Sequence, residues 1–217
     1  AKDDAQQELF NKIVNKTLQT PYTWETELSA LGQEKYEDAE AKKAAFAEKW
    51  TELIASGKLG YMALLRNLRN ILEADVDDNT IKDAAERIGN AHEVLKSKQF
   101  PFRYLSAYRE LKGNSNGKVS VVIDALEDAI QASAQNIRGF TKDTHALIAC
   151  DVSGSMYSSV SARSSVKNYD IGLVLAMLLW NRCENVVTGI FGDTWKLVNM
   201  PSKSILGNVD QMYNYAN

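Results

Sequence analysis

Apolar residues recur every three or four positions through most of the first 140 residues, the spacing that places them on one face of an α-helix. Thr23 stands where it can cap a helix that starts at Trp24, and Asn79 where it can cap one that starts at Thr80. Short loops between the segments predict antiparallel helix pairs, as in bundles and α-solenoids. Helices are predicted near residues 4–18, 24–31, 35–56, 58–73, 79–98, 100–112 and 118–136.

After residue 140 the pattern changes to shorter apolar runs with more serine, glycine and β-branched residues. The continuous apolar run HALIAC (145–150) predicts a strand buried on both faces, and Gly192-Asp193 predicts a hairpin. The predicted elements are a strand at 145–150, a helix at 168–180, strands at 185–191 and 194–200, and a helix that begins within 202–215. This order predicts the opening of an α/β domain. We place the boundary near residue 140, which gives domains 1–140 and 141–217.

Composition and charge set few limits. The 217 residues carry a formal net charge of −3, so a nucleic-acid surface must be local. Cys150 and Cys183 stand beside apolar sequence, which favours two reduced, buried thiols. The first residues are too polar for a signal peptide, and the apolar stretch 171–180 is too short to span a bilayer. We therefore expect a cytoplasmic protein without a membrane partner or, alternatively, a component of a larger particle such as a virion.

A carboxylate and two hydroxyl groups follow the predicted strand directly, in the segment DVSGSM (151–156). Asp151 would lie at the carboxyl end of the strand, where open α/β sheets bind ligands. A nucleophile elbow needs glycine two residues before the serine, and neither Ser153 nor Ser155 has one there. Mg²⁺ prefers oxygen ligands of this kind. The segment favours a magnesium site made by Asp151, Ser153 and Ser155, with helix capping by either serine as the alternative.

The sequence also resembles two modules of a known family. DVSGSM after HALIAC resembles the metal-ion-dependent adhesion site of von Willebrand factor A domains, whose motif is Asp-x-Ser-x-Ser. GIFGD (189–193) resembles the next strand of that family, which usually ends in Phe-Ser-Asp, with Gly192 in place of the serine. Four segments resemble the TROVE module of the Ro ribonucleoprotein autoantigens: YTWETELSALG, KWTELIASGKLG, LGYMALLRNLRNIL and VLKSKQFPFRYLSAYREL. The resemblance covers most of residues 20–200.

This resemblance implies a HEAT-like α-helical repeat region followed by the first half of a von Willebrand A, Rossmann-like open sheet. It implies RNA as a partner, because the family binds small structured RNAs and the single-stranded ends of misfolded RNAs. Residues 1–140 resemble only the last part of the family's helical ring. The sequence also ends before the Gly-Thr segment and the Thr-Asp loop that complete the family's metal site. A second polypeptide or a further C-terminal segment is therefore expected to complete the A domain.

Two groups of basic residues are candidates for RNA contact. In ALLRNLRN, Arg66 and Arg69 lie opposite an apolar helical stripe, where they could bind phosphate or stack on bases. Their alternation with asparagine suits a network between helices as well. From residue 96 to residue 112, basic and aromatic side chains alternate, a pattern of nucleic-acid surfaces and of packed helices alike. The residues predicted to contact RNA are Arg66, Arg69, Lys96, Lys98, Arg103 and Arg109.

The acidic segment DVDDNTIKDAAE (75–86) imitates a calcium-binding loop, but Thr80 occupies the position that needs glycine. An acidic helix start is the favoured interpretation. The sequence offers neither an acid/base pair nor an activated nucleophile, so it predicts binding rather than catalysis. The predicted function is that of a Ro-type RNA-binding protein; the alternative is a structural subunit that uses the same fold for protein–protein contact without RNA.

Overall fold

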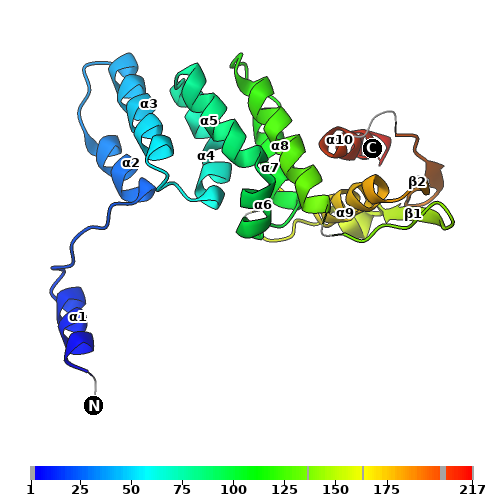
Figure 1. Cartoon of the computed structure of the whole chain (residues 1–217), viewed down its shortest axis with the longest axis horizontal. Helices are drawn as coiled ribbons and strands as arrows, with labels where there is room; N and C mark the ends of the chain where they lie inside the picture. Colours follow the sequence, from blue (N-terminus) through cyan, green and yellow to red (C-terminus); the bar gives the residue numbers. More distant parts are fainter. Residues whose placement is uncertain (1–2, 136, 163, 201–203, 217) are drawn as a thin grey trace.

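Helices α2 to α8 stand side by side in an elongated array, with α1 beyond one end and a small sheet at the other (Figure 1). The computed structural model describes residues 3–135, 137–162, 164–200 and 204–216. In this part of the chain the elements are α1 (Asp4–Val14), α2 (Trp24–Gln33), α3 (Ala39–Ala55), α4 (Tyr61–Ala74), α5 (Asp78–Gly89), α6 (Ala91–Ser97), α7 (Phe102–Leu111), α8 (Val119–Ala134), β1 (His145–Asp151), the 3-10 helix η1 (Gly154–Tyr157), α9 (Asn168–Arg182), β2 (Asn185–Phe191), β3 (Trp195–Leu197) and α10 (Ile205–Ala216). None of the described helices is long and apolar enough to cross a membrane.

The predicted helix 79–98 is in fact two helices, α5 and α6, which meet at Asn90. The backbone of Asn90 is extended, with φ −67° and ψ 113°, so the helical path is interrupted there. Its side chain accepts hydrogen bonds from the backbone N–H groups of His92 at 3.0 Å and Glu93 at 3.1 Å, which caps α6. The apolar spacing continues through the break, and for that reason the sequence predicted a single helix.

Other helix ends follow from local capping. The predicted helix 4–18 ends earlier, at Val14, and Lys16 takes a left-handed conformation with φ 53°. Thr23 caps α2 as predicted, since its hydroxyl accepts from the backbone N–H of Thr26 at 3.3 Å. Asp77, rather than Asn79, caps α5. Residues 136 and 201–203, at the ends of two predicted helices, lie outside the described residues.

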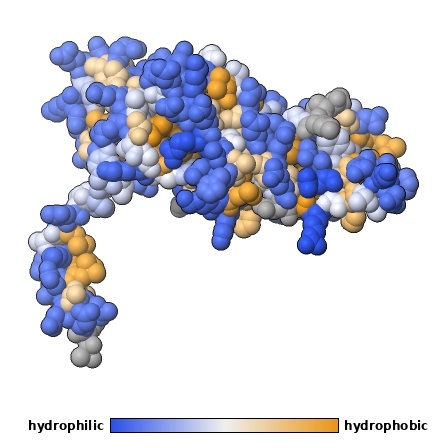
Figure 2. All heavy atoms as spheres, in the orientation of Figure 1, coloured by the Kyte–Doolittle hydropathy of each residue, from blue (hydrophilic) through white to orange (hydrophobic). Residues whose placement is uncertain are grey.

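The core of the array is formed by the apolar faces of its helices. The predicted stripe of α4 is buried, with Leu64 and Ile71 fully enclosed. Trp50 of α3 and Leu126 of α8 are among the large side chains that fill the space on either side. By contrast, α1 has no buried residue and leaves an exposed apolar stripe, visible in Figure 2, that is made by Leu9, Phe10, Ile13 and Val14.

The sheet has the order β1-β2-β3, with β1 parallel and β3 antiparallel to β2. On one face, Ile148, Cys150 and Ile190 are buried beneath the helices. On the other face, Leu147 is 67% exposed and its cross-strand partner Val187 is 50% exposed. The expectation that strand 145–150 is buried on both faces is therefore wrong, because helices of the described chain cover only one of them. The predicted strand 194–200 is shorter and spans Trp195–Leu197.

A buried ion pair joins the helical array to the α/β part. Arg109 of α7 places its Nη2 atom 2.7 Å from Oδ1 of Asp170, whose side chain is 1% exposed. Oδ2 of Asp170 accepts from the backbone N–H of Lys167 at 2.8 Å and so holds the start of α9. Burial alone would lower the pKa of Arg109, but the hydrogen bond and charge of Asp170 raise it above its ordinary value. The carboxylate thus depends on a cation from another part of the fold.

Two further contacts join the helical array to the α/β part. Glu127 of α8 accepts hydrogen bonds from the backbone N–H groups of Ile205 and Leu206, so its charge lies at the N-terminus of α10. Tyr108 donates to Asp210 of α10 at 3.1 Å, and burial together with this carboxylate raises the pKa of Tyr108 to about 12. Each contact joins residues that are far apart in the sequence.

We expect Arg109→Met to lower the free energy of unfolding by about 3 kcal/mol, because it leaves the Asp170 carboxylate buried without a cation. The matched control is Arg103→Met on the same helix, where the arginine is exposed and which should cost no more than about 0.5 kcal/mol. Adding Asp170→Asn to Arg109→Met should recover part of the loss. Urea denaturation of the four proteins measures these values. Equal losses for the two single variants would contradict a stabilising role for this ion pair.

Candidate nucleic-acid interface and metal site

A cavity of about 300 Å³ lies between α4 and α7, and three arginines line it. Arg66 and Arg69 come from α4, and Arg103 comes from α7. Half of the remaining lining is apolar, including Leu65 and Leu68, and half is polar, including the carboxylate of Glu110. The cavity therefore combines apolar and polar side chains with an excess of positive charge, a combination suited to a ligand that has both a flat ring and a negative charge.

The three arginines have different surroundings. Arg69 is held by Glu110 at 2.6 Å and by Glu73 at 3.5 Å, so two carboxylates offset its charge. This is the inter-helix network that its alternation with asparagine suggested. Arg66 is exposed and contacts no carboxylate among the described residues, and the Arg103 guanidinium lies 5.6 Å from the centre of the Phe102 ring. Arg66 and Arg103 thus keep their hydrogen-bond donors available to an anion.

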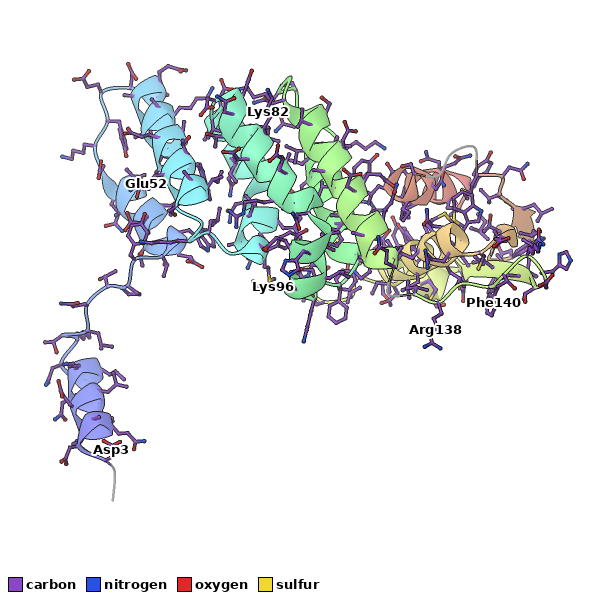
Figure 3. The ribbon with its side chains drawn as sticks, viewed as in Figure 1. Asp3, Glu52, Lys82, Lys96, Arg138 and Phe140 are labelled. Atoms are coloured by element: carbon purple, nitrogen blue, oxygen red, sulfur yellow. The ribbon has the colours of Figure 1, made fainter. Side chains whose placement is uncertain are left out.

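Lys96 and Lys98 lie next to the cavity, at the end of α6 and in the loop that follows. Both are exposed, and Lys98 takes a left-handed conformation with φ 52°. Gln99, the next residue, lines the cavity. Figure 3 shows Lys96 at the lower edge of the helical array and Lys82 of α5 at its upper edge. The structure therefore places three of the six predicted RNA-contacting residues on one cavity, and Lys98 next to a fourth lining residue, Gln99, in the chain.

The sixth residue, Arg109, is turned away from this region towards Asp170. Its aromatic neighbours are used by the fold as well. Tyr104 is fully buried, 3.4 Å from the hydroxyl of Tyr61, and Tyr108 bonds to Asp210. The alternation of basic and aromatic residues is divided between two faces of α7, so we leave Arg109 out of the candidate interface.

Phe100 belongs to this region but was missed by the sequence analysis. Its side chain is 66% exposed, the largest exposed fraction among the aromatic residues that the structure describes. The ring stacks on that of Phe102, with centroids 5.5 Å apart and planes 8° from parallel. The segment KQFPFR (98–103) carried the signal, because it sets two aromatic residues between cations and around a proline.

The predicted metal ligands also lie together. Asp151 ends β1, and its Oδ1 atom accepts from the backbone N–H of Ser153 at 2.9 Å. The hydroxyls of Ser153 and Ser155 are 3.1 Å apart. The hydroxyl and N–H of Ser153 hold the pKa of Asp151 below its ordinary value. A cavity of about 240 Å³ adjoins this loop and is lined also by Asp193 and Thr194.

These oxygens fit a magnesium ion. Neighbouring ligands of octahedral Mg²⁺, each about 2.1 Å from the metal, lie about 3 Å from one another. The separation of the Ser153 and Ser155 hydroxyls, 3.1 Å, matches that edge. Ser153 stands at the N-cap of η1 but makes no side-chain capping bond there; its hydroxyl forms a hydrogen bond with that of Ser155 instead. Within the described chain, no three His, Cys, Asp or Glu side chains gather as a metal site, which leaves a hydroxyl-rich site with one carboxylate.

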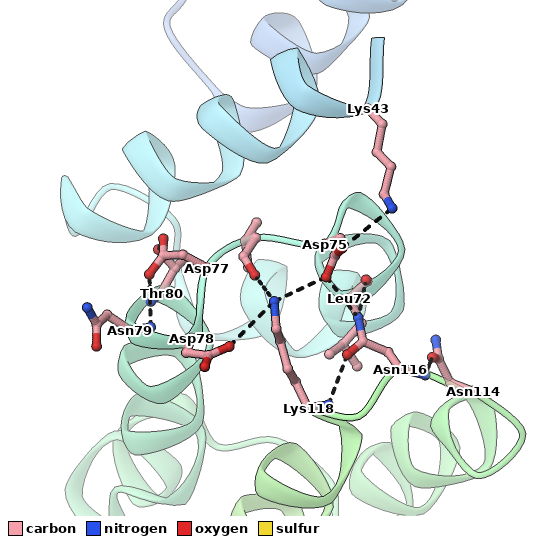
Figure 4. A network of polar contacts seen from close by, with 11 residues as sticks. Lys43, Leu72, Asp75, Asp77, Asp78, Asn79, Thr80, Asn114, Asn116 and Lys118 are labelled. Carbon is pink, nitrogen blue, oxygen red and sulfur yellow. Dashed lines mark hydrogen bonds and ion pairs between the residues drawn. The ribbon is translucent and has the colours of Figure 1, made fainter. Parts of the chain in front are cut away.

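The acidic segment 75–86 is not arranged as a calcium site (Figure 4). Asp75 pairs with Lys118 at 3.1 Å and with Lys43 at 3.6 Å, and Lys118 also approaches Asp78 at 3.5 Å. Asp77 caps α5 through the N–H groups of its first turn. Lysines and a helix start occupy these carboxylates, which confirms the favoured interpretation of the segment.

Comparison with known proteins places these features in context. Residues 15–139, more than half of the chain, match the TROVE domain family. A stretch of 94 residues is 39% identical to telomerase protein component 1 of Rattus norvegicus, and 91 residues are 38% identical to the Mus musculus protein of that name. These matches cover 43% and 42% of this chain but 3% of each relative.

The fold is similar to the crystal structure of the Deinococcus radiodurans RO (RSR) protein. The TM-score is 0.51 at 21% sequence identity, over 97% of this chain and 48% of that one. The likeness in fold thus extends over the helical array and the α/β part, and the chain spans less than half of that protein. Together with the family match over residues 15–139, these findings establish that the chain belongs to the TROVE domain family.

Proposed function

We propose that this chain binds RNA as part of a Ro-type ribonucleoprotein, through the cavity between α4 and α7. The observation that carries the proposal is the pair Arg66 and Arg103, two guanidinium groups without carboxylate partners among the described residues, on the rim of one cavity. Membership of the TROVE family and the fold shared with the Ro protein support it. Because the chain as a whole has a net charge of −3, this local cluster would supply the attraction for phosphate.

We assign different roles to the basic residues: some bind phosphate, and one holds two helices together. Arg66 and Arg103 bind phosphate oxygens in bidentate fashion across the cavity, and Lys96 and Lys98 extend the cationic surface along the RNA backbone. Arg69, held by Glu110, mainly fixes the distance between α4 and α7. Backbone contacts of this kind give affinity without sequence preference.

We further propose that the α/β part is the first half of a von Willebrand A domain with a magnesium site. Asp151, Ser153 and Ser155 would hold the ion, and bound Mg²⁺ would supply a positive centre to which a carboxylate of a partner can bind. The order of β1, α9, β2 and β3 supports this proposal, as does the loop at the carboxyl end of β1. A second polypeptide or a further segment would complete the domain.

The double variant Arg66→Ala/Arg103→Ala should bind a 12-nucleotide single-stranded RNA about tenfold more weakly than the parent chain. The slope of log K against log salt should become shallower by about 0.7 for each phosphate that the variant no longer neutralises. Fluorescence anisotropy over a range of salt concentrations measures both. The matched control is Lys82→Ala, an exposed cation at the opposite, upper edge of the array (Figure 3), which should leave the affinity and the salt slope unchanged. Equal effects of the two substitutions would argue against a specific interface.

Magnesium should bind to the assembly that contains the completed A domain with one ion per chain, and Asp151→Ala should abolish the binding because it removes the charged ligand. Ser155→Ala should weaken it. Since the pKa of Asp151 is lowered, binding should persist at pH 5 and be lost only as the pH falls through that pKa, when a proton replaces the metal. Isothermal titration calorimetry provides the measurement, with Asp83→Ala on the exposed face of α5 as control. Unchanged binding by Asp151→Ala would refute the assignment.

One observation favours a different function, that of an assembly subunit without RNA. The open face of the sheet exposes Leu147, Val187 and Leu197, the last of these by 64%, beside the half-exposed rings of Phe191 and Trp195. Exposed apolar patches of this kind mark protein–protein contacts. The absorbance ratio at 260 and 280 nm of natively purified material separates the two functions. Co-purifying RNA that salt removes supports the first, and a nucleic-acid-free complex with another chain supports the second.

A further inference from the structure

Phe100 exposes most of its ring to solvent and is not part of the buried core. It lies in the loop between α6 and α7, directly after Gln99 of the arginine-lined cavity and before Pro101. Its exposed fraction is 66%, whereas Phe102, two residues later, is partly buried. A single exposed ring is ordinary at a protein surface, so the case for a ligand rests on the groups around this ring.

The local structure fixes the orientation of this ring. Phe102 stacks against it in a nearly parallel arrangement, at 5.5 Å and 8°. Phe102 begins α7 and is itself approached by the Arg103 guanidinium at 5.6 Å. Pro101 restricts the backbone between the two rings. The Phe100 ring therefore has Phe102 as its ring neighbour and an exposed surface beside the start of α7.

The charges around the ring identify the chemistry of its ligand. Lys98 and Arg103 stand two residues before and three residues after Phe100, and Lys96 precedes them on α6. All three are exposed and contact no carboxylate among the described residues. An apolar peptide or lipid tail would not need this concentration of cations. A flat aromatic ring joined to phosphate groups satisfies the ring and the cations together.

We propose that Phe100 is a stacking platform for an unpaired nucleobase of the bound RNA, with a preference for purines. Lys98 and Arg103 hold the phosphates on either side of the stacked nucleotide, and Phe102 supports the platform from beneath. A purine presents a larger ring surface than a pyrimidine and therefore stacks more strongly. A base inside a duplex has both faces covered by its neighbours and cannot use this site. The inference rests on the proposed RNA binding and adds a residue that selects the nucleotide.

Phe100→Ala tests the proposal. The variant should bind a 12-nucleotide oligo(A) RNA about tenfold more weakly than the parent chain, which is the ordinary magnitude for removal of one base–aromatic stack. The slope of affinity against salt should stay the same, because every phosphate keeps its cation. The substitution should weaken the binding of oligo(U) less, and it should leave the binding of a fully paired RNA duplex unchanged. Phe100→Trp should keep oligo(A) binding, whereas Phe100→Leu, which is apolar but has no aromatic face, should behave like the alanine variant.

A matched control is Phe140→Ala, since Phe140 is 49% exposed and lies beyond α8, away from Lys96 (Figure 3). It should bind all three RNAs as the parent chain does. A 2-aminopurine placed within the oligonucleotide should be quenched by the parent chain and not by Phe100→Ala. If the parent chain binds none of the RNAs, the proposed function itself is wrong. If it binds them with a salt dependence set by Arg66 and Arg103, but Phe100→Ala binds oligo(A) equally well, only the stacking platform is overturned.

Discussion

The buried carboxylate of Asp170 constrains the whole arrangement, because it requires a cation and finds one on α7 of the helical array. Satisfying it with Arg109 fixes the rotation of α7 about its own axis. Residues six apart on a helix point in directions roughly 120° from each other, so Arg103 cannot face the junction while Arg109 does. The side of α7 that carries Arg103 turns towards α4 and closes the cavity. The ion pair that joins the two parts thereby sets the geometry of the candidate RNA interface.

The same junction also reaches the candidate metal loop. Tyr213 of α10 lies beneath the Arg109 guanidinium, with 5.6 Å from the guanidinium carbon to the ring centre. Tyr169 lies between Tyr213 and Tyr157, at ring distances of 5.6 and 5.9 Å, and Tyr157 belongs to η1, two residues after Ser155. Packed aromatic rings thus connect the helix that carries Arg103 to the loop that carries the hydroxyls. The two candidate sites belong to one packed unit and are not attached by a flexible linker.

Much of this fold could be predicted because it depends on local pattern. The helical periodicity, the cap at Thr23 and the position of Asp151 at the end of a strand are properties of short segments. Long-range features could not be predicted in the same way. Arg109 and Asp170 are brought together by the fold alone, so the sequence could not show that this arginine has an internal partner. The break at Asn90 could not be predicted because the apolar spacing is the same in α5 and α6. The exposed face of the sheet could not be predicted either, because an apolar strand sequence does not show whether helices cover one face or both.

Some of the basic residues are paired with carboxylates and hold helices together, whereas others are unpaired and can bind an anion. Arg69, Arg109 and Lys118 each meet a carboxylate, and each of these pairs joins two helices. Arg66, Lys96, Lys98 and Arg103 have similar surroundings in sequence but meet no carboxylate among the described residues. Ion pairs that stabilise a fold consume charge, so the cations that remain unpaired carry most of the field at the surface. Other described cations, among them Lys35, Lys82 and Lys142, also meet no carboxylate, so what distinguishes Arg66 and Arg103 is that both line one cavity. Attraction of a phosphate backbone is the function that makes physical use of them.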